Sequence, residues 1–453
     1  MTDIKKVAVF GAGVMGAGIA AQVANAGIPV VLMDIAAEGG NPSAIAEGAV
    51  ARLLKTDPAP LMHKRNARLI TPGNIDDDMD LIADCDWIIE AIIERLDLKQ
   101  SLYAKIEAAR KPGSIVSSNT STLPLGVLTD GMADSLKADF LITHFFNPPR
   151  YLRLLEVVAG EHTRAEALAA VRRFGDHGLG KTIVPCKDTP GFIANRIGIY
   201  WLQCGVVRAM DEGLTIEEAD AVMGRPAGIP KTGIFGLLDM VGLDLMPHVL
   251  GGMAGALPET DPFHEVFREP ELIKRMIDDG YTGRKGKGGF YRLKPDTRDR
   301  IKEAVDLGTG RYRTADKPKP DSVAAAKKGG LKALLEHSDK TGRYAWWVLS
   351  RTLSYAARLV PEISDDITGV DDAMRLGYNW KFGPFELIDQ LGSGWFAERL
   401  REDGQAVPKL LETAAGRPFY RTQNGRLQCL GPDGAYRDVV RPDGVLLLAD
   451  IKR

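Results

Sequence analysis

The segment KKVAVFGAGVMGAG, at the start of the chain, limits what the chain can fold into more than any other stretch. Its apolar run Val7 to Phe10 predicts a short buried strand, and the alanine-rich run that follows, ending near Gly27, predicts a helix. The turn between them has the pattern G-x-G-x-x-G, made by Gly11, Gly13 and Gly16. Glycines at these positions permit a tight turn, close approach of a pyrophosphate, and close helix packing, so a dinucleotide-binding α/β domain is expected.

The residues after the turn indicate which dinucleotide the domain would hold. Backbone amides at the helix amino terminus would face the phosphates, which places Val14 and Met15 beside the cofactor. A second apolar run, PVVLMD, ends in Asp34, whose carboxylate would accept hydrogen bonds from the adenosine ribose and repel a 2′-phosphate. No Lys or Arg occurs between Asp34 and Arg52. We therefore expect NAD as the cofactor rather than NADP.

Three further apolar runs predict more strands of the same sheet: Asp86 to Ile92, Ser114 to Asn119 and Phe140 to Phe145. Helical stretches separate them, which is typical of a doubly wound parallel sheet. Ligands bind beyond the carboxyl ends of the strands in such sheets. The polar residues at or just after these ends are Glu94 with Lys99, Ser118 to Ser121, and His144.

The stretch HFFNPPRYLRLLE places His144 at the end of an apolar run and Glu156 within the apolar run that follows. The Asn-Pro-Pro sequence turns the chain between them, and RLLEVV would return as a strand, bringing Glu156 against the imidazole. A buried carboxylate that accepts from one ring nitrogen fixes the tautomer and leaves the other nitrogen as a base. This arrangement suits the oxidation of an alcohol.

Five motifs occur in the order in which one enzyme family has them: GAGVMGAGIA, SNTS, HFFNP, the following Leu-Leu-Glu, and CKDTPGFIANR. Over roughly Ile4 to Tyr291 the chain resembles the L-3-hydroxyacyl-CoA dehydrogenase family. The resemblance implies a Rossmann-type domain followed by helical domains like the carboxy-terminal domain of 6-phosphogluconate dehydrogenase. It also implies NAD-dependent oxidation of an L-(S)-3-hydroxyacyl-CoA to the 3-oxoacyl-CoA in fatty-acid β-oxidation, with no metal.

The resemblance also implies roles for individual residues. His144 would be the general base and Glu156 its orienting partner, while Ser121 and Asn195 would contact the substrate oxygens. The implied NAD contacts are Asp34, Glu94, Lys99, Ser121 and Asn147.

Several of these residues have a plain structural alternative. His144, beside two phenylalanines, would also fit a core position. Asn195 would also fit as a hydrogen-bonding residue at the start of its helix, and Ser121 as a helix cap. Glu94 and Lys99 would also fit an exposed ion pair.

The second half of the chain contains an internal repeat. KTGIFGLLDMVG, from Lys231 to Gly242, aligns without gaps to KFGPFELIDQLG, from Lys381 to Gly392, and half of the positions are identical. We expect two related all-α modules, of which only the first carries an Asn195-type motif, so the second is expected to be purely structural. Their matched apolar positions predict that the second module packs on the first within the chain.

These observations predict five segments. They are an NAD-binding domain over residues 1–185, a first helical, substrate-side domain over 186–293, a polar linker over 294–340, a second helical domain over 341–416, and an irregular or hairpin tail over 417–453.

Composition excludes several partners. The 453 residues carry a formal charge of -2, which gives no attraction to nucleic acid or to an anionic membrane. The uncharged run Val7 to Met33 is broken by glycines, so no membrane span is expected. Four scattered cysteines suggest no metal site and a cytoplasmic protein. An acyl-CoA is the expected partner, with a monomer possible through pairing of the helical modules and a homodimer still open.

Two other functions remain open at this stage. β-Hydroxyacid dehydrogenases also begin with a dinucleotide fold followed by helices, but they resemble enzymes with a catalytic lysine. A non-catalytic structural protein on the same scaffold, as the related lens crystallins illustrate, is the other alternative.

Overall fold

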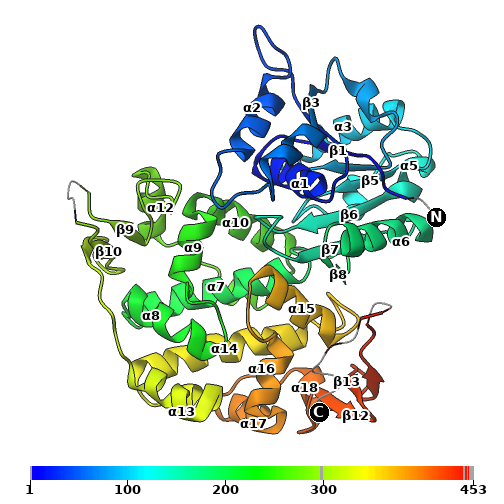
Figure 1. Ribbon diagram of the computed structural model, residues 1–453. Coiled ribbons are helices and arrows are strands. Elements are labelled where there is room, and N and C mark those ends of the chain that lie inside the picture. The colour runs from blue at the N-terminus through cyan, green and yellow to red at the C-terminus, as the bar shows by residue number, and fades with distance from the viewer. Residues whose placement is uncertain (1–2, 296–298, 442–443, 446, 448–453) are drawn as a thin grey trace. The chain divides into compact units, whose positions relative to one another are not determined.

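The computed structural model describes residues 3–295, 299–441, 444–445 and 447 (Figure 1). The chain divides into two compact units, Met1–Phe192 and Ile193–Arg453. This division falls shortly after residue 185, where the sequence suggested the first boundary. Among the described residues no single helix is long and apolar enough to cross a membrane, although Phe235–Val241 and Leu243–Ala256, bent by 81°, pass that test as a pair.

The first unit is built on one eight-stranded sheet. Its strands lie in the order β3 (Ile70–Asn74), β2 (Val30–Asp34), β1 (Val7–Phe10), β4 (Trp87–Glu90), β5 (Ile115–Ser118), β6 (Phe140–Phe145), β7 (Leu154–Ala159) and β8 (Thr182–Pro185). The strands from β3 to β6 are parallel, β7 runs antiparallel to β6, and β8 is parallel to β7. The order β3-β2-β1-β4-β5-β6 is that of a doubly wound dinucleotide-binding sheet, which confirms the predicted fold.

Helices cover both faces of this sheet (Figure 1), and β1 shows why. Val9 packs in a core cluster with Ile19 of α1 (Val14–Asn25), whereas Phe10 packs in a second cluster with Ile106 of α3 (Leu96–Ala109). Because successive strand residues point to opposite faces, a strand that is apolar throughout must be buried on both sides. The other helices of this unit are α2 (Ala44–Leu53), α4 (Leu125–Leu128), α5 (Asp134–Asp139) and α6 (Ala165–Arg173).

The second unit contains both copies of the sequence repeat. The first copy comprises α7 (Ala194–Asp211), α8 (Ile216–Val222), α9 (Phe235–Val241), α10 (Met246–Ala256), α11 (Phe263–Val266), α12 (Glu271–Asp278), β9 (Tyr291–Leu293), β10 (Lys302–Val305) and β11 (Tyr312–Thr314). The second comprises α13 (Asp321–Leu335), α14 (Lys340–Arg358), α15 (Ile367–Gly377), α16 (Pro384–Leu391), α17 (Ser393–Glu402), α18 (Lys409–Ala414), β12 (Tyr420–Gln423), β13 (Arg426–Leu430) and β14 (Tyr436–Asp438). Each copy thus adds a three-stranded antiparallel sheet to its helices.

One aspartate joins the helices of each copy to its small sheet. Asp239 of α9 accepts hydrogen bonds from the backbone amides of Phe290 and Tyr291 at 2.7 and 2.8 Å. Asp389 of α16 accepts from those of Phe419 and Tyr420 at 2.6 and 2.8 Å. The two copies therefore share not only the aligned helices but also the hydrogen bonds between these helices and the small sheets.

The strands of the two small sheets repeat a further contact. The guanidinium carbon of Arg292 lies 3.6 Å from the centre of the Tyr312 ring, and that of Arg421 lies 3.7 Å from the centre of the Tyr436 ring. The described part of the tail, expected to be irregular or to form hairpins, consists of antiparallel strands and is the counterpart of β9 to β11. Residues 442–443, 446 and 448–453 of that tail lie outside the described residues.

The stretch 294–340, expected to be a polar linker, contains β10, β11 and the helix α13 in its described part. Its apolar residues explain this difference. Ala304 and Val305 of β10 are buried, as are Leu331, Leu334 and Leu335 of α13. The lysines and prolines that suggested a linker lie between and beside these buried positions.

The second copy packs on the first within the chain, mainly through α14 against α7. The Tyr344 hydroxyl of α14 donates to the Gly205 carbonyl of α7 at 3.0 Å, and the rings of Tyr200 and Tyr355 stack with centroids 4.1 Å apart. The matched phenylalanines of α9 and α16 do not form this interface, contrary to expectation. Each packs inside its own copy, Phe235 on Phe290 and Phe385 on Phe419.

Candidate active site

His144 and Glu156 form the centre of the candidate site. They are paired residues of the antiparallel strands β6 and β7, so both side chains lie on the same face of the sheet. Nδ1 of His144 lies 2.7 Å from Oε2 of Glu156. Glu156 is fully buried and His144 is 6% exposed. The carboxylate accepts the Nδ1 proton, which leaves Nε2 as the basic nitrogen.

Two aromatic side chains flank the imidazole. The ring of Phe146 meets it edge to face with centroids 4.6 Å apart, and the Phe192 ring lies 5.6 Å away. These contacts, together with Glu156, restrict the ring to one orientation. His144 is therefore surrounded as a core residue would be, and it is also oriented as a base requires.

Side chains from the neighbouring strand end brace this position. Asn119, which follows β5, accepts a hydrogen bond from the Phe145 backbone amide at 2.9 Å through Oδ1. Ser121 lies two residues further on, and its backbone amide donates to Glu94 at 3.1 Å. Ser121 does not cap the next helix, because the residue at the amino-terminal cap of α4 is Pro124. The sequence named this polar cluster but gave Asn119 no role.

Glu90, to which the sequence assigned no role, is a buried carboxylate at the end of β4. Its Oε1 accepts from Lys99 Nζ at 2.6 Å, and its Oε2 accepts from the hydroxyls of Tyr103 and Ser118, each at 2.6 Å. Burial, and then the charge of Glu90, raise the pKa of Tyr103 well above its usual value. The sequence does indicate a buried charge here, because the segment WIIE places an ionisable residue at the end of an apolar strand.

Glu94 and Lys99 form a partly buried cluster instead of an exposed pair. Lys99 is 1% exposed, and its Nζ lies 3.2 Å from Glu94 Oε2. Glu94 also accepts from the Thr120 hydroxyl at 2.5 Å. Burial by itself raises the pKa of Glu94, but Lys99 and the hydrogen bonds from Thr120 and Ser121 bring it below the usual value. Lys99 thus holds Glu94 and Glu90 in place, whereas Glu94 lies at the surface, where a cofactor can reach it.

The glycine turn has the shape that a dinucleotide needs. A β-carbon on Gly11, whose φ is +98°, would lie 2.5 Å from the Ala91 carbonyl oxygen, and one on Gly16 would lie 1.8 Å from that of Gly11. At Gly13, by contrast, no atom of the described residues other than its two chain neighbours lies within 4 Å of that position. The turn is therefore crowded at Gly11 and Gly16 and open at Gly13. The open side lies at the start of α1, where the amides of Val14 and Met15 can receive a pyrophosphate.

Asp34 ends β2 beside this turn. Its Oδ2 accepts a hydrogen bond from the Ala12 backbone amide at 2.6 Å, and its Oδ1 accepts from the Ile35 amide at 2.7 Å. Arg52 of α2 donates to the Ala12 carbonyl at 3.3 Å, so a guanidinium also lies at the turn. The residues present fit a bound dinucleotide, and the partly exposed Asp34 carboxylate lies beside the turn.

The turn between β6 and β7 carries the exposed Asn147 and is held from beneath by Lys181. The Lys181 ammonium, in a side chain that is 2% exposed, donates to the carbonyls of Pro149 and Leu152. Burial, with a smaller contribution from Arg153, lowers the pKa of Lys181 to about 8. No sequence pattern marks this lysine, because its partners are backbone carbonyls.

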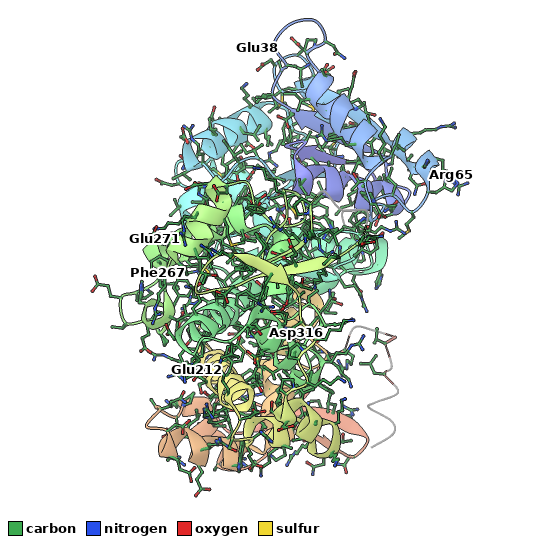
Figure 2. All side chains as sticks on the ribbon, turned by 90° about the vertical axis from the view of Figure 1, so that its left-hand side faces the viewer. Glu38, Arg65, Glu212, Phe267, Glu271 and Asp316 are labelled. Atoms are coloured by element: carbon green, nitrogen blue, oxygen red, sulfur yellow. The ribbon has the colours of Figure 1, made fainter. Side chains whose placement is uncertain are left out.

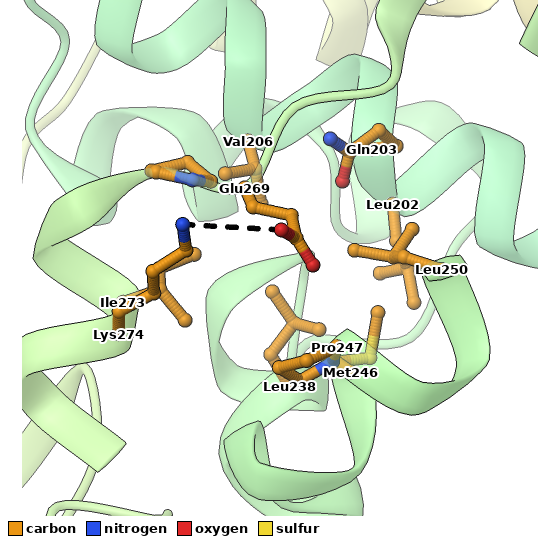
Figure 3. A pocket seen from close by; sticks show the side chains of 11 residues that line it. Leu202, Gln203, Val206, Leu238, Met246, Pro247, Leu250, Glu269, Ile273 and Lys274 are labelled. Atoms are coloured by element: carbon orange, nitrogen blue, oxygen red, sulfur yellow. Dashed lines mark ion pairs between the residues drawn. The ribbon is translucent and has the colours of Figure 1, made fainter. Parts of the chain in front are cut away.

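Asn195 belongs to the other compact unit, where it lies half-buried in the first turn of α7. Further along this helix a pocket that is partly open to solvent is lined by apolar side chains, including Leu202, Val206 and Leu250, and has a volume of about 60 Å³. Glu269 and Lys274 also line it, and their charged atoms lie 3.9 Å apart (Figure 3). Such a lining fits an apolar group and offers little to a polar one.

The sheet order, the open glycine turn and the oriented histidine define a dinucleotide-binding α/β protein with an acid–base pair at the carboxyl end of its sheet. Residues 6–189 match the NAD-binding domain of 3-hydroxyacyl-CoA dehydrogenase, and residues 191–293 match the carboxy-terminal domain of the same family. The chain belongs to the 3-hydroxyacyl-CoA dehydrogenase family, and its cofactor is NAD. Both predictions from the sequence are confirmed.

Individual relatives agree with the family. A protein of Bacillus subtilis named a probable 3-hydroxyacyl-CoA dehydrogenase is 40% identical over 445 residues, covering 93% of this chain but 56% of the relative. The chain thus spans little more than half the length of that relative. A protein of the same name from Deinococcus radiodurans is 43% identical, covering 66% of this chain and 85% of the relative. The crystal structure of an Escherichia coli 3-hydroxybutyryl-CoA dehydrogenase shares the fold, with a TM-score of 0.68, 24% identity, and coverage of 91% of this chain and 98% of that one.

Proposed function

We propose that the protein catalyses the reversible, NAD-dependent oxidation of an L-(S)-3-hydroxyacyl-CoA to the 3-oxoacyl-CoA. The observation that carries this proposal is the buried His144–Glu156 pair, with Nδ1 and Oε2 2.7 Å apart, in the same unit as the glycine turn. A base with a fixed tautomer and a dinucleotide site are the two parts that oxidation of a secondary alcohol requires.

His144 takes the hydroxyl proton at Nε2 during oxidation and returns it during reduction. Glu156 stabilises the imidazolium that forms, because its buried carboxylate already accepts the Nδ1 proton. Ser121 and Asn195 bind the substrate oxygens and orient the reacting carbon. NAD, when bound, supplies the hydride acceptor. The protein contributes orientation of the substrate and a proton acceptor, and both lower the activation barrier because the reacting groups are already in position.

For the cofactor, Gly11, Gly13 and Gly16 with the amides of Val14 and Met15 bind the pyrophosphate, and Asp34 binds the adenosine ribose. Asn147 and Glu94, both exposed, complete the proposed contacts. Lys99 acts on the cofactor only through Glu94, because its ammonium is buried against Glu90.

The acyl tail is proposed to lie along α7. Leu202 and Val206 follow Asn195 by two and three helical turns, so they share its face of the helix, and Leu202 lies about 10 Å further along. The apolar pocket that they line, about 60 Å³ in volume, is a suitable place for the end of a short tail. For the CoA phosphates, exposed basic residues of the first unit such as Arg65 are candidates (Figure 2).

A role in fatty-acid β-oxidation, a cytoplasmic location and a monomeric state are proposed with this activity. Cys85, Cys204 and Cys429 are free thiols, as is usual in a reducing compartment. The packing of α14 on α7 supports a monomer, since it covers a face of the first copy from within the chain. Homodimerisation through another face remains an outcome that light scattering would detect.

An assay with acetoacetyl-CoA and NADH tests the activity, followed spectroscopically as NADH is consumed. A series of 3-oxoacyl-CoA substrates of increasing chain length then reports on the tail. We expect kcat/KM to rise from the four-carbon substrate to chains that reach the pocket. If protein that binds NADH consumes none of these substrates, the proposed activity is wrong.

A further inference from the structure

A tyrosine of the second copy reaches the proposed substrate-binding asparagine of the first. The Tyr378 hydroxyl, just after the end of α15, donates to Asn195 Oδ1 at 3.4 Å. The two residues are far apart in the sequence but lie in the same compact unit. The second copy therefore touches the side chain that the proposed reaction uses.

This approach is possible because α7 has no side chain at Gly198. A β-carbon there would lie 2.0 Å from Cζ of the Tyr378 ring and 2.4 Å from its hydroxyl oxygen. Trp201, one turn further on, meets the Tyr378 ring edge to face with centroids 6.3 Å apart. The ring is thus seated in a notch of the helix, three residues after Asn195.

The neighbouring residue, Arg196, is also held by the second copy. Arg196 is 1% exposed, and its Nε donates to the Tyr355 hydroxyl of α14 at 2.5 Å. That hydroxyl donates in turn to Asp261 at 2.8 Å, and Asp261 accepts from Arg196 Nη2 at 2.5 Å. Two consecutive residues of the first turn of α7 are therefore fixed by tyrosines of the second copy.

We propose that Tyr378 is a positioning residue, which sets the orientation of the Asn195 amide for the substrate. A phenol that donates to Oδ1 fixes the amide plane and leaves the Nδ2 hydrogens for a substrate oxygen. This inference rests on the proposed role of Asn195. It gives the second copy a part in the reaction beyond the structural role that the sequence suggested.

The test compares two conservative substitutions on tyrosines of the second copy. Tyr378→Phe keeps the ring in the Gly198 notch and removes only the hydroxyl. Tyr344→Phe is the matched control, because its hydroxyl also bonds α7, but at the Gly205 carbonyl. We expect Tyr378→Phe to lower kcat/KM by about 3- to 10-fold, the effect of one neutral hydrogen bond, with unchanged NADH affinity. Tyr344→Phe should leave the kinetics unchanged.

The Asn195→Ala background separates positioning from a general structural effect. In that background Tyr378→Phe should not lower kcat/KM any further, because the amide that Tyr378 orients has been removed. An equal loss in both backgrounds, or unchanged kinetics of Tyr378→Phe in the wild-type background, would overturn the inference.

A readout independent of activity distinguishes this failure from failure of the proposed function. The Asn195 side-chain amide resonances, identified by their loss in Asn195→Ala, should shift in Tyr378→Phe and stay in place in Tyr344→Phe. If they shift but no 3-oxoacyl-CoA is reduced, the contact is real and the proposed function is wrong. If they do not shift, Tyr378 does not position Asn195, whatever the wild-type activity.

Discussion

His144 and Glu156 are paired across the antiparallel strands β6 and β7, and this register, not proximity in the sequence, brings the imidazole within 2.7 Å of the carboxylate. A shift of one residue in the register would point one of the two side chains to the opposite face of the sheet. The buried apolar residues on both faces of β6 prevent such a shift.

Replacing His144 by Gln should remove most turnover while NADH affinity stays near wild type. Loss of a positioned general base costs on the order of 10²- to 10⁴-fold in rate, whereas the proposed contacts of the dinucleotide are the glycine turn and Asp34. Steady-state kinetics and NADH fluorescence titration measure the two effects. An equal loss of NADH binding would show that this histidine is structural.

Replacing Asp34 by Ala should narrow the preference for NAD over NADP, by about 10-fold in the ratio of kcat/KM values. The substitution removes a ribose contact and the repulsion of a 2′-phosphate. It also removes the acceptor for the Ala12 amide, so Asp34→Asn serves as the control, because it keeps an oxygen there without the charge. Unchanged selectivity in both variants would contradict the assignment.

Replacing Lys99 by Met should lower the free energy of unfolding by about 3–5 kcal/mol, because it leaves the buried carboxylate of Glu90 without its cation. Lys105→Met on the same helix is the matched control. Lys105 and Asp76 form an exposed pair at 3.2 Å, for which about 0–1 kcal/mol is expected. Chemical denaturation measures both, and similar effects of the two substitutions would argue against the buried network.

Lys181 should make stability rise with pH in the alkaline range. Its pKa falls from 10.5 to about 8 on folding, so between these values the folded protein binds fewer protons than the unfolded chain. The free energy of unfolding therefore increases as pH rises from about 8 to 10.5, with a slope of at most about 1.4 kcal/mol per pH unit. Lys181→Met should lack this component of the slope, and identical slopes in the two proteins would refute it.

Removing the second copy should expose the face of α7 that α14 covers. Because β10 and β11 complete the sheet of the first copy, the cut belongs after Lys317 and not at residue 293, where the sequence placed the end of that module. Light scattering should show dimers or aggregates. A truncated protein that stays a fully active monomer at high concentration would show that α14 covers nothing the first copy needs.

The sequence by itself determined the fold class, the cofactor and the family. Strand periods, the glycine turn and the carboxylate after the second strand are local patterns, and each follows from backbone geometry within a few residues of the chain. The same holds for His144 and Glu156, since one turn between two strands suffices to bring them together.

Only the tertiary structure decided which distant side chains meet. Glu90 gathers Lys99, Tyr103 and Ser118 from two other elements, and Tyr378 reaches Asn195 across a glycine notch. The residues 294–340, polar enough to suggest a linker, carry the few buried apolar positions that build α13 and β10. Such contacts depend on the packing of whole elements. A buried charge is stable only if the fold brings a partner to it, and a missing β-carbon matters only if the fold brings a side chain into the space that it leaves.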